Sequence, residues 1–192
     1  SGKTTLIKIL CGLLQPTEGA VLVDGQAVGP YTKSIISYLP DRMYFADWMK
    51  ATDLFDLFAD FYSDFDRTRA MSMCASLGVT PSDRLKSMSK GTKEKVQLVL
   101  VMARKAQLYL LDEPIAGVDP AARDYILNTI ISNYNSQATI IISTHLIADI
   151  EKVLDEVVFI SEGRIVLSSS VDEIRAENGK SVDALFREVF KC

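Results

Sequence analysis

The sequence is poor in several features that mark particular classes of protein. Its three cysteines, Cys11, Cys74 and Cys192, are too scattered for a zinc site or a disulfide framework, and they fit a reducing cytosol. No apolar run reaches the length of a membrane span, so any role at a membrane is expected to be peripheral. Internal repeats and low-complexity linkers are absent as well. A length of 192 residues predicts one large domain, or one domain with a subdomain, around a substantial core.

An excess of positive charge is also missing. The formal net charge is −4, and no basic stripe runs along the sequence. Domains that bind nucleic acid attract the phosphate backbone with clustered Lys and Arg, so this composition argues against nucleic acid as the main partner. Apolar residues make up 48% of the chain and charged residues 24%, as in ordinary globular proteins.

Short apolar runs alternate with helical patterns along the chain, which is typical of an α/β fold with a mainly parallel sheet. The runs at 108–111 and 139–142 are apolar without alternation, as expected of strands buried on both faces. Turn signals at Asp24-Gly25 and Glu162-Gly163 predict hairpins toward the edge of the sheet. The predicted strands are 20–25, 35–40, 108–114, 139–145, 156–161 and 164–169.

A helical pattern follows the second of these strands. Apolar residues recur at helical spacing from Leu54 to Phe61, with Thr52 as the predicted N-cap. A second predicted helix, over 67–77, is closed by Gly78. Near the end of the chain, residues 181–190 predict an amphipathic helix that packs against its own domain.

We interpret residues 41–92 as a small helical subdomain inserted into an α/β core formed by 1–40 and 93–192, all within one domain. Carboxylates are spread around both of its helices, which predicts a solvated acidic face and disfavours a metal cluster. They are Asp53, Asp56, Asp60, Asp64 and Asp66.

The chain opens on the string S-G-K-T-T, followed by an apolar helical stretch. Gly2, Lys3 and Thr4 match the last three positions of the phosphate-binding motif G-x-x-x-x-G-K-[ST], whose first glycine would precede Ser1. On its own, this half motif equally fits an N-cap with Lys and Thr on the surface. Because the chain starts inside the motif and without a methionine, we expect it to be a fragment.

Two acidic residues follow the strand predicted at 108–111. Ligands of open α/β sheets bind beyond the carboxyl ends of the strands, so Asp112 and Glu113 stand where a Mg²⁺-bound phosphate would lie. Asp112 would hold the metal, and Glu113 would act as general base on the attacking water. An acidic end of a strand without any ligand is an equally good interpretation of this pair alone.

The only histidine of the chain, His145, also ends a predicted strand. A lone histidine is more often structural than catalytic. Its position at a third strand end nevertheless favours contact with a γ-phosphate or with Glu113.

A small polar segment, 89–92, precedes a long helix that we expect to begin near Lys93. Its backbone amides and the helix dipole would form an anion site, and a capped helix start without ligand is the alternative.

Taken in order, the strings SGKTT, YLPD, MSKG, LYLLDEP, GVDP and STH resemble the nucleotide-binding domain of ATP-binding cassette (ABC) transporters. The resemblance covers the whole chain and is closest to the ATPase subunits of bacterial ABC-2-type exporters. It implies a P-loop NTPase core whose first strands would precede Ser1, and hydrolysis of ATP with Mg²⁺. The implied partners are a second nucleotide-binding domain, arranged head to tail, and an ABC-2-type transmembrane permease at the cytoplasmic face of the plasma membrane.

The same resemblance assigns roles to single residues. Lys3 would contact the β- and γ-phosphates, Thr4 and Asp112 would hold Mg²⁺, and Glu113 and His145 would be catalytic. Asp119 would belong to the D-loop. The implied ATP-binding residues are Ser1, Gly2, Lys3, Thr4, Thr5 and Asp41, and the implied signature residues, which reach ATP on the partner, are Met88, Ser89, Lys90, Gly91 and Thr92.

Two positions depart from the pattern of the family. Lys90 stands where the signature usually has glycine, a variant familiar in the exporter subgroup. Asp41 replaces the usual glutamine after YLP, reaches less far, and would either strengthen metal binding or repel phosphate. Tyr44 and Trp48, which follow Asp41 within the segment 41–70, are the expected contacts with the transporter, although core packing is the alternative for this segment.

Two other functions remain as alternatives. The chain would be an inactive or complementation-dependent fragment if the half motif cannot hold phosphate. A non-transport ABC ATPase that acts on DNA or the ribosome ranks lower, because tandem domains, a coiled-coil insertion and basic arms are missing.

Overall fold

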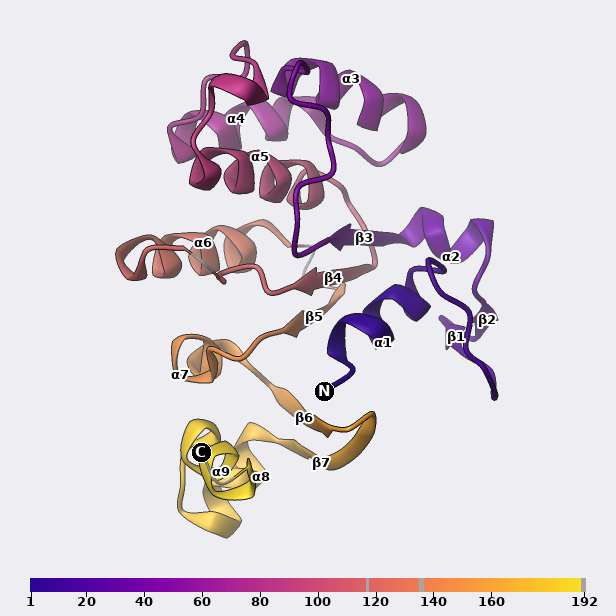
Figure 1. The fold of residues 1–192 in the computed structure, drawn as a ribbon, viewed down its shortest axis with the longest axis vertical. Helices are drawn as coiled ribbons and strands as arrows, with labels where there is room; N and C mark the ends of the chain where they lie inside the picture. Colours follow the sequence, from indigo (N-terminus) through magenta and orange to yellow (C-terminus); the bar gives the residue numbers. More distant parts are fainter. Residues whose placement is uncertain (117, 135–136, 191–192) are drawn as a thin grey trace.

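The protein has an α/β fold, seen in the computed structural model of Figure 1. The described residues are 1–116, 118–134 and 137–190. The strands are β1 (Leu22–Val23), β2 (Gln26–Ala27), β3 (Ile36–Leu39), β4 (Leu108–Asp112), β5 (Thr139–Ser143), β6 (Glu156–Ser161) and β7 (Arg164–Ser170). The helices are α1 (Lys3–Leu10), α2 (Pro30–Ile35), α3 (Ala51–Phe61), α4 (Arg67–Leu77), α5 (Lys90–Met102), α6 (Pro120–Asn133), α7 (Ile147–Ile150), α8 (Val171–Asn178) and α9 (Val182–Phe190), with short 3-10 turns η1 (Leu85–Ser87) and η2 (Glu151–Val153).

A parallel sheet of three strands, in the order β3-β4-β5, forms the centre of the molecule. Its helices lie on both faces, as the sequence predicts for an α/β fold. The two predicted hairpins are present at Asp24-Gly25 and Glu162-Gly163, as separate antiparallel pairs β1-β2 and β6-β7. The first residue of the chain touches the second hairpin, because the Gly163 amide donates to the Ser1 carbonyl at 3.0 Å.

Strand β4 is covered on both faces, which explains its uninterrupted apolar run. Leu108 and Leu110 pack on the side of α1, against Ile7. Tyr109 and Leu111 alternate to the other side and join the large core formed with α5 and α6.

Strand β5 differs from its prediction. The apolar run 139–142 predicts burial on both faces, yet Ile141 is 39% exposed. Ile140 and Ile142 pack against the α5–α6 core, whereas α1 covers β4 on the opposite face and leaves Ile141 open. The prediction was therefore right for the strand and wrong for one of its faces.

Helices α3, α4 and α5 pack together above the sheet in Figure 1, around buried residues such as Leu54, Phe55 and Met73. The predicted end of α4 is confirmed, since Gly78 has a φ of 65° and caps the helix. Whether residues 41–92 form a subdomain of their own stays a prediction.

Two predicted helix starts are wrong. Thr52 is not the N-cap of α3, because the helix is capped at Lys50, whose amide donates to the Asp53 carboxylate at 2.9 Å. Helix α5 begins at Lys90 and not near Lys93, because the Ser89 hydroxyl already caps it. In both cases a side-chain to backbone hydrogen bond sets the boundary.

Arg104 joins the helical segment, residues 41–92, to the sheet. Its guanidinium is 2% exposed, pairs with Asp64 at 2.9 and 3.0 Å, and donates to the carbonyls of Ser34 and Ile36. It also lies 3.8 Å from the centre of the Tyr62 ring. One buried cation thus connects the loop after α3 with the start of β3.

The acidic residues of this region serve mainly as local partners. Besides Asp64, Asp56 pairs with Arg67, and Asp66 caps α4 by accepting from the Arg69 amide at 3.0 Å. These contacts give Asp56, Asp64 and Asp66 partners within the chain.

The C-terminal helices form a smaller core with the second hairpin, at the lower end of Figure 1. Val182 and Leu185 of α9 are buried, and Phe186 meets Phe159 of β6 edge to face at 5.3 Å between ring centres. The predicted amphipathic helix is confirmed, although Val189 is 41% exposed. Within the described ranges, no helix combines the length and the apolar character that a bilayer span requires.

Candidate functional site

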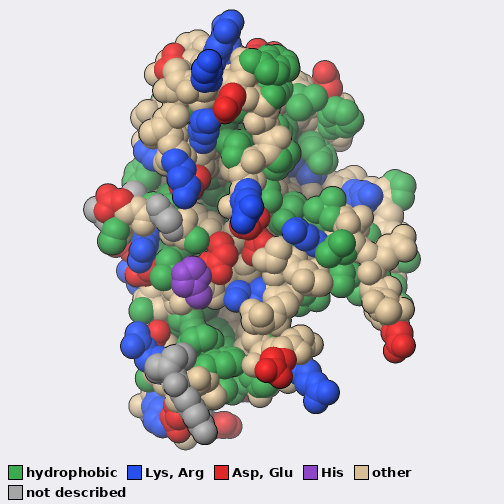
Figure 2. All heavy atoms as spheres, in the orientation of Figure 1, with side chains coloured by type: hydrophobic (Ala, Val, Ile, Leu, Met, Phe, Trp, Pro, Cys, Tyr) green, Lys and Arg blue, Asp and Glu red, His purple; other side chains and the backbone are tan. Residues whose placement is uncertain are grey.

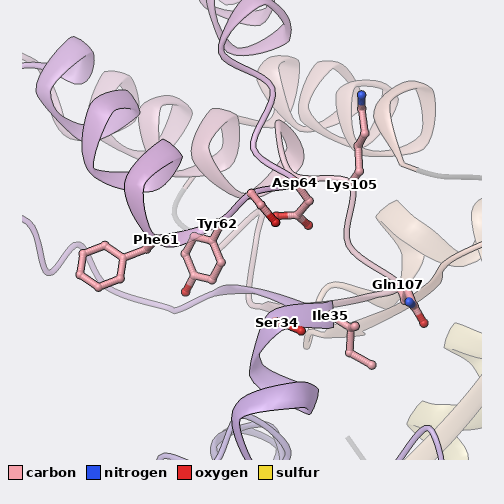
Figure 3. A pocket seen from close by; sticks show the side chains of 8 residues that line it. Ser34, Ile35, Phe61, Tyr62, Asp64, Lys105 and Gln107 are labelled. Atoms are coloured by element: carbon pink, nitrogen blue, oxygen red, sulfur yellow. The ribbon is translucent and has the colours of Figure 1, made fainter.

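A cavity of about 230 Å³ lies beside Arg104 and is lined by Ser34, Phe61, Asp64 and Lys105 among others (Figure 3). Ser34 comes shortly before β3 and Lys105 shortly before β4, so the cavity sits at the amino ends of the parallel strands. Ligands of such sheets bind at the carboxyl ends. The candidate site is therefore sought at the opposite end.

Helix α1 presents the half phosphate-binding motif. Gly2 has a φ of 106°, a left-handed conformation that side chains rarely adopt, and it leads directly into the helix at Lys3. Lys3 Nζ donates to the Ser1 hydroxyl at 3.1 Å. Thr4 and Thr5 follow in the first turn, so the motif residues lie together at the amino end of a helix, where backbone N–H groups favour anions.

Asp112 is the last residue of β4 and is only 1% exposed. The register places it opposite Ser143 of β5, whose hydroxyl donates to Asp112 Oδ1. Its second oxygen, Oδ2, is buried without a hydrogen-bond partner in the described part of the chain. A buried carboxylate oxygen that lacks a partner is costly, and a hard divalent cation such as Mg²⁺ fits this donor.

Glu113 follows with a φ of 52°, a strained conformation for a residue with a side chain. Its amide donates to the Ser143 carbonyl at 2.9 Å, which holds the turn against β5. Its carboxylate oxygen Oε1 lies 3.0 Å from Nδ1 of His145. The structure therefore brings together the residues at two strand ends, and Figure 2 shows acidic side chains beside the histidine.

Asp41 lies at the start of the loop that follows β3, near Asp112 and Glu113. Together with Asp112, Glu113 and Gln97 it lines a small cavity of about 30 Å³. Its own side chain is 42% exposed and has a long ion pair with Arg42, at 3.8 Å.

Two neutral side chains flank Asp112 on the α1 side. Burial, followed by the charge of Asp112, raises the pKa of Cys11 to about 12, and the same two causes come first in raising the pKa of Tyr38 to about 12. Both groups stay protonated at neutral pH. Because a thiolate binds metal and a thiol does not, Cys11 does not compete with Asp112 for a cation.

The signature residues lie at the start of α5. Ser89 Oγ accepts from the Thr92 amide at 3.1 Å, Lys90 is 81% exposed, and a Cβ at Gly91 would meet no atom within 4 Å. Met88 packs against the large core. Among the described residues, no hydrogen bond or ion pair joins this set to Lys3 or Glu113.

The D-loop residue of the sequence prediction, Asp119, stands directly before α6. Its carbonyl accepts from the Arg123 amide at 3.2 Å, in the first turn of the helix. Gly117 of the same GVDP string lies outside the described residues.

Sequence reasoning missed Ser143 and Gln97, which both touch the site. Ser143 sits in the string STH, and the pairing of β5 with β4 places it beside Asp112. Gln97 interrupts the apolar string VQLVLVM of α5, and a polar residue in such a run was the available signal.

A parallel sheet with a glycine-lysine motif before one helix and acidic residues at a strand end defines the class of P-loop NTPases. Within that class, residues 1–116 match the family model described as ABC transporter. The chain belongs to the ABC transporter family.

Relatives of known sequence and structure agree with this assignment. The chain is 29% identical to an uncharacterized ABC transporter ATP-binding protein of Synechocystis, over 91% of the chain and 51% of that protein. It is 28% identical to the ABC transporter ATP-binding protein YtrB of Bacillus subtilis, over 92% of the chain and 62% of YtrB. The chain thus spans about half to two thirds of the length of these relatives. A solved ATP-binding subunit of an ABC transporter superposes with a TM-score of 0.82 at 27% identity, covering 98% of the chain and 83% of that subunit.

Proposed function

We propose that this protein binds and hydrolyses ATP, and that hydrolysis drives a membrane exporter of the ABC-2 type. The contact between Glu113 and His145 beside the unpartnered Asp112 oxygen carries the proposal. This arrangement combines a carboxylate for water, a group that orients it, and an oxygen for a cation, at the carboxyl ends of parallel strands.

Asp112 and Thr4 would hold Mg²⁺, which neutralises phosphate charge when it is bound. Lys3, at the amino end of α1, would bind the β- and γ-phosphates by charge-assisted hydrogen bonds. Ser143 orients Asp112 by donating to Oδ1, which leaves Oδ2 free to face the cation.

Glu113 would accept the proton of the attacking water. Its main-chain hydrogen bond to Ser143 and its contact with His145 restrict the carboxylate to one position. The side chain of His145 is 62% exposed, so it can also contact an oxygen of a phosphate group that binds from solvent.

A second nucleotide-binding domain would complete the site. The open surroundings of Gly91 and the exposure of Lys90 support a role for the signature in reaching ATP on another subunit, a copy or a related chain. Asp119, which precedes α6, would lie at the same interface. Asp41 would lie close to the bound Mg²⁺.

The transmembrane subunit would dock on the helical segment, at the cytoplasmic face of the plasma membrane. Tyr44 is 62% exposed, Trp48 is 68% exposed, and Phe61 is 76% exposed, whereas Phe45 packs into the large core. Large exposed aromatic side chains are typical of interaction surfaces. The acidic net charge of the chain supports a protein partner over nucleic acid.

The decisive test is the variant Glu113→Gln. We expect turnover of ATP to fall at least about a hundredfold, because the amide cannot accept the proton of water, while ATP binding persists and the ATP-bound dimer accumulates. ATPase assays and size-exclusion chromatography with ATP measure both effects.

Glu162→Gln is a matched control, since Glu162 is also a glutamate with positive φ, 48°, but lies in the β6-β7 turn. This variant should hydrolyse ATP at the unmodified rate. Continued rapid turnover by Glu113→Gln would refute the proposed role of Glu113.

A further inference from the structure

Gln97 is a buried polar residue on the core side of α5. It is 4% exposed and lies between the buried residues Val96 and Leu98. Burying an amide without a hydrogen bond costs free energy, so its partner is informative. Its Nε2 donates to the backbone carbonyl of Arg42 at 3.2 Å.

This hydrogen bond attaches α5 to the loop that carries Asp41. A second tie between the same helix and strand β3 lies one turn further along, where the Ser37 hydroxyl donates to the Val101 carbonyl at 2.9 Å. Of these two hydrogen bonds, the one from Gln97 lies at the cavity, because Gln97 lines it together with Asp41, Asp112 and Glu113.

The side chain of Asp41 does little to fix its own position. It is 42% exposed, and its contact with Arg42, 3.8 Å long, joins neighbours in sequence. Such exposed pairs contribute little to stability. The backbone of the next residue, held by Gln97, therefore decides where the carboxylate of Asp41 lies. An aspartate is one methylene shorter than a glutamine, so its reach depends more strongly on the backbone.

We propose that Gln97 is a positioning residue of the ATPase site, which fixes Asp41 at the catalytic cavity through the Arg42 carbonyl. The inference rests on the proposed function. Because Gln97 lies two turns after Ser89 on the same helix, it also links the position of the signature to that of Asp41. A movement of the start of α5 is thereby transmitted to the loop after β3.

The test is Gln97→Met, which keeps the length of the side chain and removes the donor. We expect kcat for ATP to fall about tenfold, the equivalent of one lost hydrogen bond, with KM for ATP within about twofold. The Mg²⁺ concentration for half-maximal activity should rise, because Asp41 no longer lies at a fixed distance from the metal site. Gln107→Met, at an exposed position before β4, is the control and should change neither quantity.

A double-mutant cycle with Asp41→Ala separates positioning from packing. If Gln97 acts through Asp41, Gln97→Met should have almost no further effect on kcat in the Asp41→Ala background. An equal loss in both backgrounds, or an unchanged kcat in Gln97→Met, overturns the inference.

Gln97→Asn repeats the test with a polar side chain that is too short to reach Arg42, and it carries the test if the methionine variant is unstable. We expect the same loss of kcat. Absence of ATP hydrolysis in the unmodified protein would refute the proposed function instead, so the two failures are distinguishable.

Discussion

Glu113 illustrates how single residues are committed to a task in this protein. Its positive φ is unfavourable by about 1 kcal/mol. Two contacts hold this conformation: the hydrogen bond from its amide to Ser143 of β5, and the contact of its carboxylate with His145. Asp24 and Glu162 have similar φ values, but they lie in hairpin turns. Strain at a strand end, beside a buried carboxylate oxygen that lacks a partner among the described residues, points to function more than strain in a turn does.

A pH-dependent contribution to stability belongs to Glu173, in the cap of α8. Its pKa is lowered below the usual 4.5, chiefly by the hydrogen bond from the Ser170 amide and further by hydrogen bonds from the hydroxyls of Ser169 and Ser170. The folded protein therefore favours the charged form. This contribution is fully present above pH 4.5 and is lost as the pH falls through the lowered value.

We expect Glu173→Gln to destabilise the protein at pH 7 and to approach the unmodified protein in stability below pH 4. Urea unfolding across this pH range measures the difference. Glu177→Gln, an exposed change on the same helix, should show no such convergence. A constant difference between Glu173→Gln and the unmodified protein at every pH would contradict the prediction.

At the scale of elements, the contacts that join the helices to the sheet are the features that the sequence did not predict. Arg104 follows α5 and contacts Asp64, the Tyr62 ring and the carbonyls of Ser34 and Ile36 at the start of β3. When either member of a buried ion pair is removed, the charge of the other member is left uncompensated.

Arg104→Met should lower the free energy of unfolding by about 3 kcal/mol, because Asp64 loses its partner and two buried carbonyls lose their donor. For a chain of this size, the expected fall in Tm is about 10 °C. Thermal unfolding followed by circular dichroism measures it. Arg42→Met, at a side chain 90% exposed, should leave Tm within about 1 °C, and an equal fall in both variants would contradict this account.

The sequence predicted the strands and the helices α1, α3, α4, α5 and α9, because periodicity and turn residues are local signals. The start of α3 was misplaced at Thr52 because Asp53 reaches back to the amide of Lys50, a bond that spacing alone does not reveal. The exposure of Ile141 was missed for a different reason. An apolar run shows that a strand is suited to burial, but the neighbouring elements decide which face is covered.

At the scale of the whole molecule, α1 packs against β4 through Ile7, and its amino end is directed toward the end of the sheet at which β4 and β5 finish (Figure 1). Binding of ATP should therefore depend on a residue that is distant in sequence from Glu113. Lys3, in the first turn of α1, is that residue.

We expect Lys3→Ala to weaken the binding of Mg-ATP at least about tenfold, because a charge-assisted hydrogen bond to phosphate is lost. Titration calorimetry measures the affinity. Lys8→Ala, in the last turn of the same helix, should bind as the unmodified protein does. Equal affinity of the Lys3 and Lys8 variants would show that α1 does not hold the phosphates.

The sequence by itself determined the α/β class, the two hairpins and the order of motifs that identifies the family, because all of these are encoded in short stretches. Only the tertiary structure decided which motifs meet. Ser143 and Asp112 are 31 residues apart, Arg104 and Asp64 are 40 apart, and Gln97 and Arg42 are 55 apart. Parallel strand pairing and the packing of α5 bring each pair together, and a hydrogen bond across such a separation leaves no local signal in the sequence.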